Sequence, residues 1–598
     1  MTTPPTSPSY RLTILAGWLL AVAILLATSA DAIRFMRYPD ADDAMRMVQV
    51  RDWLAGQGWF DVAQHRLNRG DFPMHWSRLV DLPLAAGILL LRPLLGAALA
   101  EQLTAVAVPL LTLLAIMALL AAIVRRVAGA ATVPYAVLLV ALSSPLLAQV
   151  RPLRIDHHGW QIVLALAAVR ALVARPTWRS GAAIGVALAL LLTVSLEGMP
   201  IAAAIAGVAM LRWALAPVSR GFALALGWSL AGAAVLLHLA TRGPGFWTPA
   251  CDAIAPVWLA ALVTAAGGVT LAIVVARFGV VARLGALALA GAGAAALLAW
   301  LAPVCLMGPF ATLPPLVYRF WYLMVLEGRP LWEQSPWWAA TTIGLPLAGI
   351  AGTLLALRDA TAGRRSSWLL LLAVQAAALG VAIMVNRAGA TANALAVPGA
   401  AVLLHRLLAR ARAIPTTLPR IAATLGALLL ASPGQVAAMA LLAVPTVDPV
   451  VEQGMEHRRH PCRWSTDMAV LSALPRGTVF APIDVTPALL VATPHAAVAG
   501  GYHRGAAAMN RVMTAFMAPP DRARAIVLAS GADYLAACPG MNEMQLYRVA
   551  APQGLWSRLE RGERVAWLAP IPLPGPVLAW RVIRPADAAP LREAPARR

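Results

Sequence analysis

Long apolar runs alternate with short polar gaps over the first three quarters of the chain. About thirteen of these runs approach or reach the roughly 20 apolar residues that a membrane-spanning helix needs. Arginine, proline and glycine mark the ends of the runs. The pattern predicts spans at about 11–30, 101–124, 131–149, 160–174, 181–196, 199–215, 221–240, 257–276, 281–302, 338–357, 367–385, 392–409 and 420–444.

The pattern changes after residue 446. From there to residue 598, apolar runs of strand length alternate with turn signals. This predicts a small α/β domain over 447–598, following a transmembrane domain over 1–446. Within the latter, the segment 31–100 is too long for a simple connector, and loops of that length are usually functional. It contains an apolar stretch from Asp81 onward that suits an interfacial helix, a re-entrant helix or an extra hairpin.

The first apolar run, "RLTILAGWLLAVAILLATSA" from Arg11 to Ala30, has two interpretations. Its small final residues resemble the cleavage site of a signal peptide. Its apolar part, about 19 residues, is longer than the core of a typical signal peptide and near the length of a span. We therefore favour an uncleaved first span.

Composition supports a polytopic α-helical membrane protein. The chain is 60% hydrophobic and 13% charged, with a mean hydropathy of +0.72, whereas soluble domains carry about 25% charged residues. Every one of the 48 basic residues is arginine, and the formal net charge is +21. The charge does not predict nucleic-acid binding, because no basic stripe interleaves with aromatic residues.

Sidedness follows from where the arginines lie. They concentrate in the gaps after the even-numbered spans, as expected when those gaps and the N-terminus face the cytoplasm. The segment 31–100 and the C-terminal domain then lie outside. The exclusive use of arginine and the abundance of alanine suggest a GC-rich bacterial genome. We therefore expect a multi-pass protein of the bacterial cytoplasmic (inner) membrane, with its C-terminal domain in the periplasm.

Four cysteines occur, all in or beside the predicted outside segments, where disulfides are permitted. Three pairings are possible. The simplest joins Cys251 to Cys305 and Cys462 to Cys538. The cysteine spacing does not indicate a metal site.

Acidic residues gather in the outside gaps close to predicted spans, where charge is costly and usually functional. Carboxylates with an imidazole suit Mg²⁺ or Mn²⁺, and His158 lies two residues from Asp156. Such a metal can neutralise a phosphate leaving group, while a spare carboxylate orients or deprotonates an acceptor. For Glu197, an alternative is a helix N-terminal acid. The acids are Asp40, Asp42, Asp43, Asp156, Glu197 and Glu327.

The tail contains one further candidate, "AGGYHRG" from Ala499 to Gly505. Paired glycines permit close approach of the backbone, and His503 and Arg504 suit a phosphate or a sugar acid. An ordinary surface turn is the alternative. The glycine pair lacks the spacing of a nucleotide-binding motif.

Over residues 11–445 the chain resembles the GT-C membrane glycosyltransferases, most of all the oligosaccharyltransferase catalytic-subunit family. "DADDAMRMVQVRDWL" matches the acidic motif of the first outside loop, and "DHHGWQI" matches a second motif, Asp-x-Glu-Gly, with His158 in the Glu position. "VLEGRP" offers the loop glutamate, Glu327. "VNRAGATANALAVPG" offers Arg387 for the lipid pyrophosphate. The family's Trp-Trp-Asp motif is absent from the tail.

The resemblance implies transfer of a sugar or glycan from a polyprenyl-phosphate- or diphosphate-linked donor to an unknown acceptor on the periplasmic face. The implied catalytic residues are Asp40, Asp42, Asp43 and Glu327, without a choice among the three aspartates. Asp43, Asp156 and His158 would hold Mn²⁺ or Mg²⁺. Substrate would contact Arg387, Glu197, His503 and Arg504.

Two other classes of protein remain open. A transporter or flippase would carry ionisable residues deep inside its spans and broken helices in matching halves. A non-catalytic scaffold with a periplasmic interaction domain would leave the acids without a purpose.

Overall fold

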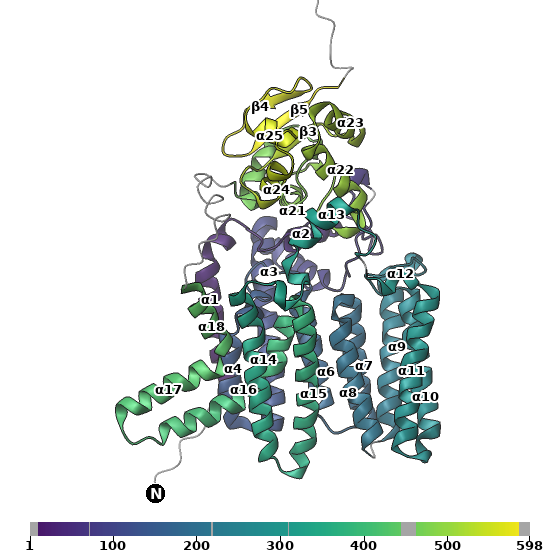
Figure 1. Cartoon of the computed structure of the whole chain (residues 1–598), viewed down its shortest axis with the longest axis vertical. Helices are drawn as coiled ribbons and strands as arrows, with labels where there is room; N and C mark the ends of the chain where they lie inside the picture. The colour runs from purple at the N-terminus through teal and green to yellow at the C-terminus, as the bar shows by residue number, and fades with distance from the viewer. Residues whose placement is uncertain (1–9, 71, 217–218, 309, 444–461, 585–598) are drawn as a thin grey trace, which may run out of the picture.

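The structure is a computed structural model that describes residues 10–70, 72–216, 219–308, 310–443 and 462–584. A helical bundle forms its lower part in Figure 1, and a smaller part with all the strands lies above it. The long helices are α1 Tyr10–Arg34, α3 Asp81–Val127, α4 Val133–Leu142, α6 His158–Leu172, α7 Trp178–Val194, α8 Met199–Leu215, α9 Arg220–Arg242, α10 Pro256–Val274, α11 Val280–Leu301, α14 Pro336–Arg358, α15 Ala362–Met384, α16 Gly389–Arg412, α17 Thr417–Ala431 and α18 Pro433–Ala443.

The polytopic helical fold is confirmed, but a count of thirteen spans is not. Among the described residues, nine helices are long and apolar enough to cross a membrane, or ten if α17 and α18, bent by 91°, form one span. Helices α6 and α7 have only 15 and 17 residues. The run predicted over 131–149 is interrupted at Ser143, which separates α4 from the short α5, Ser144–Ala148. Apolarity alone therefore overestimates the number of full-length spans.

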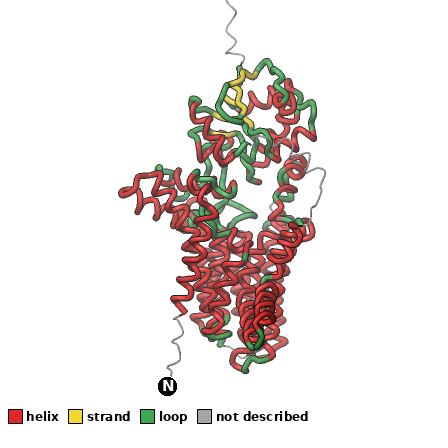
Figure 2. The backbone as a smooth tube through the Cα atoms, turned by 90° about the vertical axis from the view of Figure 1, so that its left-hand side faces the viewer, coloured by secondary structure: helices red, strands yellow, loops and turns green. Residues whose placement is uncertain are grey.

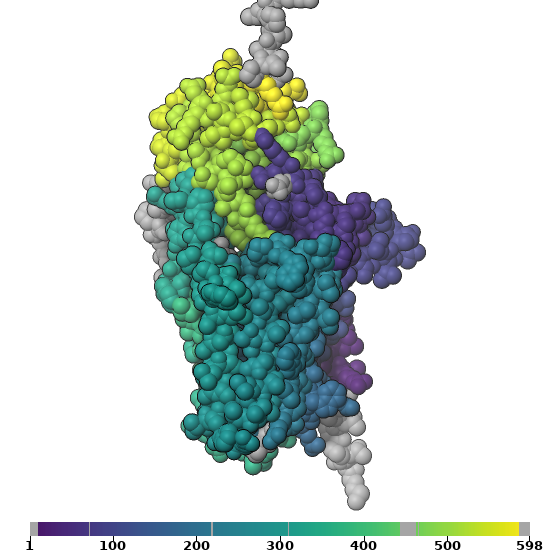
Figure 3. Space-filling view, turned by 90° about the vertical axis from the view of Figure 1, so that its right-hand side faces the viewer, coloured from purple at the N-terminus to yellow at the C-terminus, as the bar shows by residue number. Residues whose placement is uncertain are grey.

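The apolar stretch from Asp81 is the first part of α3 and not a separate hairpin. The helix breaks at Gly96, which adopts φ +76° in the left-handed region that glycine enters without penalty. The segment before the break projects from the side of the bundle, as Figure 3 shows at right. Leu90 and Leu94 on it are 75% and 82% exposed. An exposed apolar helix at the edge of a bundle is typical of a membrane interface.

The C-terminal part is a small α/β unit, as predicted, and the yellow strands of Figure 2 mark its sheet. The strand order is β2-β1-β3-β5-β4, with β1 parallel to β2 and β3, and β5 antiparallel to β3 and β4. The predicted domain boundary at 446/447 lies outside the described residues. The strands are β1 Thr478–Phe480, β2 Ala496–Ala497, β3 Tyr534–Ala537, β4 Leu568–Ile571 and β5 Leu578–Val582.

The first long loop joins the bundle to the C-terminal part. Its helix α2, Ala41–Leu54, packs against α21, Thr486–Ala492, and shares one buried apolar cluster with it. Arg51 donates a hydrogen bond to the carbonyl of Val491 at 2.5 Å, and Arg66 donates to Leu490 and Thr493. Disulfides join Cys251 to Cys305 and Cys462 to Cys538, which confirms the simplest predicted pairing.

Candidate active site

A cavity of about 510 Å³ lies where the bundle, the first loop and the C-terminal part meet. Its walls are largely apolar, and a few ionisable side chains from distant parts of the chain converge on it. These are Asp42, His75, His157, Glu197, Asp252, Arg387 and His503. A concave, mostly apolar pocket with convergent polar groups is the usual form of a ligand site.

The start of α2 sets the orientation of the three neighbouring aspartates. Asp40 is the N-cap and accepts a hydrogen bond from the backbone N–H of Asp42 at 3.0 Å. Successive residues of a helix point about 100° apart, so Asp42 and Asp43 face different surroundings. Asp42 lines the cavity. Asp43 is fully buried behind it, and its Oδ1 accepts hydrogen bonds from the backbone N–H groups of Ile155 and Asp156 at 2.8 and 3.0 Å.

Arg154 links the carboxylates of two loops. Its guanidinium lies 2.9 Å from Asp40, 3.2 Å from Asp43 and 3.1 Å from Asp156. A tight turn brings it there, since Leu153 adopts φ +69° and donates its N–H to the carbonyl of Ala105. Burial opposes ionisation of Asp156, but the charge of Arg154 holds the pKa of Asp156 well below its usual range.

Asp42 forms no ion pair within the described residues, and burial outweighs the opposing charge of Arg387 in setting its pKa. Burial raises the pKa of Asp42 to about 8, and the negative charges of Asp40, Asp156 and Glu327 add to this shift. A carboxyl group with a pKa near neutrality is suited to exchanging a proton with a substrate. Burial raises the pKa of Asp43 well above its usual range as well, so Asp42 differs from Asp43 in lining the cavity and not in the direction of its pKa shift.

The two adjacent histidines and Glu197 offer a site for a divalent cation. His158 shares a hydrogen bond with Asp156 through Nδ1 at 2.7 Å, while its buried Nε2 has no hydrogen-bond partner in the part of the chain that the structure describes. Ligand atoms of His157, His158 and Glu197 all lie within 4.8 Å of one another. A carboxylate that orients a histidine whose other nitrogen is free is the usual second shell of a metal site. The residues present thus fit a metal ion.

Three short 3₁₀ turns position the remaining ionisable groups. Glu197, Glu327 and Arg387 lie in the turns Leu196–Gly198, Leu326–Gly328 and Asn386–Ala388. Arg387 forms ion pairs with both glutamates, the one with Glu327 at 2.5 Å. Only folding brings these turns together, because they are 130 and 190 residues apart along the chain from Glu197. The predicted cluster around Asp42 and Asp156 therefore includes Glu197, Glu327 and Arg387.

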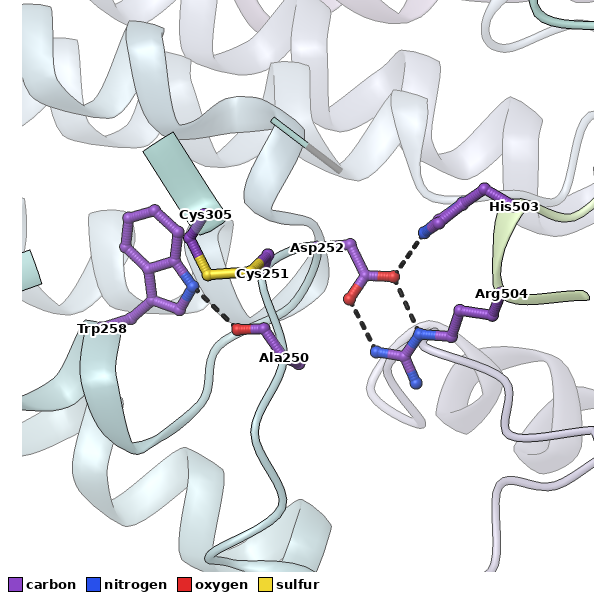
Figure 4. The surroundings of a disulfide bond; sticks show 7 residues. All are labelled: Ala250, Cys251, Asp252, Trp258, Cys305, His503 and Arg504. Atoms are coloured by element: carbon purple, nitrogen blue, oxygen red, sulfur yellow. Dashed lines mark hydrogen bonds and ion pairs between the residues drawn. A yellow bond between two sulfur atoms is a disulfide. The ribbon is translucent and has the colours of Figure 1, made fainter. Parts of the chain in front are cut away.

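A second polar cluster occupies another wall of the cavity, shown in Figure 4 beside the disulfide at Cys251. Asp252 accepts a hydrogen bond from His503 Nε2 at 2.6 Å and two from Arg504, at 2.8 and 2.7 Å. His75 Nδ1 lies 3.9 Å from the same carboxylate. His503 lines the cavity, whereas the guanidinium of Arg504 is bound to Asp252 and to the carbonyl of Pro73.

Sequence reasoning missed three of these residues. Arg154 stands two positions before Asp156, so the pairing of an arginine with a motif acid was a usable signal. Asp252 follows Cys251 directly, and the predicted disulfide could have drawn attention to it. Nothing in the sequence singles out His75, since its neighbours across the cavity come from 177 and 428 residues further along the chain.

Neither a model of a known protein family nor a curated protein sequence matches the chain. Solved structures do match. Archaeal oligosaccharyltransferase AglB from Archaeoglobus fulgidus, in complex with an inhibitory peptide and a dolichol-phosphate, gives a TM-score of 0.62 at 14% identity, over 94% of this chain and 73% of that one. The apo form of the A. fulgidus enzyme gives a TM-score of 0.60 at 14% identity, over 91% of this chain and 72% of that one. The complex of that enzyme with Zn and sulfate gives a TM-score of 0.56 at 14% identity, over 90% of this chain and 70% of that one.

The chain has the fold of an oligosaccharyltransferase. The likeness spans the bundle, the first loop and the C-terminal part, because it covers nine tenths or more of the chain. The resemblance predicted from four short motifs is thereby confirmed at the level of fold. At 14% identity the likeness shows the fold alone, and the chemistry depends on the side chains of the cavity.

Proposed function

We propose that the protein is a membrane glycosyltransferase that moves a sugar or glycan from a polyprenyl-phosphate- or diphosphate-linked donor to an acceptor. The reaction would take place in the cavity beneath the C-terminal domain, on the periplasmic face of a bacterial inner membrane. One observation carries the proposal: a carboxyl group and an arginine line the cavity, close to a buried imidazole nitrogen without a hydrogen-bond partner among the described residues. The first two are Asp42 and Arg387, and the nitrogen is Nε2 of His158, which follows the cavity residue His157.

The donor phosphate would bind at Arg387. The guanidinium is held by Glu197 and Glu327, so a phosphate entering the cavity would exchange with one of them as partner. Arginine recognises phosphate by paired, charge-assisted hydrogen bonds. The A. fulgidus enzyme of the same fold has been solved with a dolichol-phosphate, which supports a lipid-linked donor here. The polyprenyl tail would extend among the apolar walls.

Bond making and breaking would occur at the anomeric carbon of the donor sugar. A nucleophilic atom of the acceptor forms a bond to that carbon and passes its proton to Asp42, whose pKa of about 8 suits a base near neutral pH. The bond from the carbon to the phosphate oxygen breaks, and its electron pair leaves with the lipid phosphate. Arg387 would stabilise that charge. Glu327, paired with Arg387, would position it.

A divalent cation, Mn²⁺ or Mg²⁺, would supply further charge neutralisation at the leaving phosphate. We propose that His158 holds it through Nε2 together with His157 and Glu197, and that Asp156, also predicted as a ligand, orients His158 through Nδ1. Asp43 was predicted as a ligand too, and we now assign it a positioning role. Its Oδ1 already accepts two backbone hydrogen bonds and its Oδ2 lies beside Arg154, which fixes the turn that carries Asp156. The A. fulgidus structure with Zn and sulfate supports a metal in this fold.

The acceptor would approach from the side of the C-terminal domain. His503 lines that wall of the cavity and would contact it, while Arg504 would hold His503 in place through Asp252. The cavity does not distinguish a lipid, glycan or protein acceptor. The absence of Trp-Trp-Asp from the tail argues against recognition of an asparagine sequon by that motif.

The proposal is tested by ligand-induced stabilisation of the detergent-purified protein, titrated with Mn²⁺ and a polyprenyl phosphate or diphosphate. A ligand at 100 times its Kd should stabilise the fold by about 2.7 kcal/mol. We expect Glu197→Gln to lose the Mn²⁺ effect and Arg387→Gln to lose the lipid-phosphate effect. Asp521→Asn, an exposed carboxylate on α23 (Pro520–Ser530) of the C-terminal domain, is the matched control and should retain both.

Failure of both ligands to stabilise the unmodified protein would overturn the proposal. The competing function is transport or flipping of a lipid-linked substrate. Stabilisation by the lipid phosphate in both variants, with no effect of Mn²⁺ on any protein, would favour that alternative. Transport assays in vesicles would then replace the transfer assay.

A further inference from the structure

Five arginines surround a pocket at the opposite end of the bundle from the active site. Helix α6 begins at His158, and its 15 residues carry the chain roughly 22 Å away from the cavity. Helix α7 starts at that far end and returns to Val194, which lines the cavity. The pocket, of about 610 Å³, lies among the ends of α3, α6 and α7 and is lined by Arg125, Arg126, Arg170, Arg175 and Arg179.

The pocket is open because its floor consists of small side chains. The floor residues are Ala122, Ala171, Ala174 and Ala183, which leave space between the three helices. No acidic residue lines the pocket, and within the described part of the chain none of the five arginines forms an ion pair. One of them is fixed by a neutral group, since Arg126 Nε donates a hydrogen bond to the carbonyl of Val173 at 2.7 Å.

The general preference for arginine at one membrane face does not explain this convergence. Arg358, Arg364 and Arg365 belong to the same end of the bundle, because α15 starts there and ends near Arg387. They satisfy the same preference, yet they do not line the pocket. Five like charges around one hollow repel one another, and a multivalent anion would relieve that repulsion. Arginine favours phosphate because of its planar array of donors.

Trp178 indicates the source of the anion. It is the first residue of α7, directly between the pocket residues Thr177 and Arg179, and it is 60% exposed. Exposed tryptophan is enriched at the level of the lipid headgroups, where its ring is part apolar and part polar. A basic pocket between helix ends at that depth is the usual form of a site for a phosphate-rich headgroup.

We propose that this pocket binds the headgroup of an anionic bilayer lipid that carries two phosphates. Its glycerol backbone would lie against the alanine floor, and its phosphates would contact the arginines. The site is separate from the catalytic cavity, and the inference does not depend on the proposed transferase activity. Its effect would be to hold the ends of α3, α6 and α7 together on the side away from the cavity.

The test is stabilisation of the full-length, detergent-purified protein by cardiolipin, with phosphatidylcholine as the neutral lipid and pyrophosphate as the soluble anion. The pocket variant is Arg170→Gln/Arg175→Gln/Arg179→Gln. The matched control, Arg358→Gln/Arg364→Gln/Arg365→Gln, removes the same charge from the same end of the bundle. Each arginine near a lipid surface contributes about fivefold to binding, so the pocket variant, which lacks three, should need about 100-fold more cardiolipin for half-maximal stabilisation.

We expect the control variant to respond to cardiolipin as the unmodified protein does, with no response to phosphatidylcholine. Equal loss in both variants would overturn the proposal, because surface charge alone would then account for binding. Stabilisation by pyrophosphate as large as that by cardiolipin would overturn the assignment to a lipid. If the triple variant does not fold, Arg175→Gln alone should weaken cardiolipin binding about fivefold, since the Arg175 side chain makes no hydrogen bond to any described residue.

Discussion

Replacing Arg154 by methionine should destabilise the protein because it leaves buried carboxylates without their counter-ion. The side chain is 6% exposed and lies within 3.2 Å of three aspartates. Removing one partner of a buried ion pair costs about 3–5 kcal/mol. Asp40 is 34% exposed and adds little to this, so Asp43 and Asp156 account for most of the cost. We expect the free energy of unfolding to fall by about 3–5 kcal/mol.

The variant should also gain more stability than the unmodified protein when the pH falls from 7 to 5. In the unmodified protein the pKa of Asp156 lies below its unfolded value, so that group's stabilisation is present above pH 4 and is lost as the pH falls further. Without Arg154, the largest interaction that lowers the pKa of Asp156 is lost, and the pKa of Asp43, which burial already raises well above its usual range, rises further. Protonation then favours the folded state, so the variant should gain stability between pH 7 and pH 5.

The assay is denaturant unfolding in detergent at pH 7 and pH 5. Arg151→Met is the matched control, because Arg151 is exposed, lies in the same loop and carries the same charge. A surface substitution of this kind should change the free energy of unfolding by less than about 0.5 kcal/mol. If Arg154→Met is as stable as Arg151→Met at pH 7, the reasoning about an obligatory buried counter-ion is wrong.

Four further outcomes are expected. Asp42→Asn should lower sugar transfer at least about 100-fold without loss of stability, measured by single-turnover assay and thermal unfolding; an active variant would exclude Asp42 as the base. His158→Ala should abolish stabilisation by Mn²⁺, followed by thermal shift with and without a chelator, whereas full retention would remove His158 from the metal site. Loss of the disulfide Cys251–Cys305, which closes a loop of 54 residues, should lower the free energy of unfolding by about 4 kcal/mol. Denaturant titrations of a Cys251→Ser/Cys305→Ser variant measure this, and an unchanged free energy of unfolding would contradict it. Asp252→Asn should raise the KM for the acceptor more than it lowers kcat if it positions His503; an unchanged KM would limit Asp252 to a structural role.

The helical architecture could be read from the sequence because apolar length alone decides most spans. The prediction of spans failed where the apolar run was barely long enough to cross a membrane. The run over 131–149 looks continuous in hydropathy, yet Ser143 and Pro145 end α4 after ten residues. In the tail, "RARAIVLASGADYLAAC" indicates helix, strand, turn and strand, but Ile526–Ser530 continues helix α23 and only Tyr534–Ala537 is a strand. A short apolar run fits both the 3.6-residue period of a helix and the two-residue period of a strand, so it does not distinguish them.

The sequence singled out acidic residues that the fold brings together, and the role of each in a site stays a prediction. The acids close to predicted spans were identified because charge near a membrane is costly and is usually functional. The choice between Asp42 and Asp43 was not accessible, since it depends on how α2 is rotated against the turn at Ile155 and Asp156. The pairing of Asp252 with His503 and Arg504 spans about 250 residues, and no local pattern records such a contact.

The joint between α2 and α21 has a consequence for biosynthesis. Arg51 finds its acceptor, the carbonyl of Val491, 440 residues later in the chain. At a synthesis rate of 5–20 residues per second, roughly 20–90 s separate the two ends of that hydrogen bond at the ribosome. During this interval the first loop lacks the surface that completes it. The wall of the cavity that His503 provides is therefore among the last to form, and a nascent chain carries Asp40, Asp42 and Asp43 for most of its synthesis without that wall.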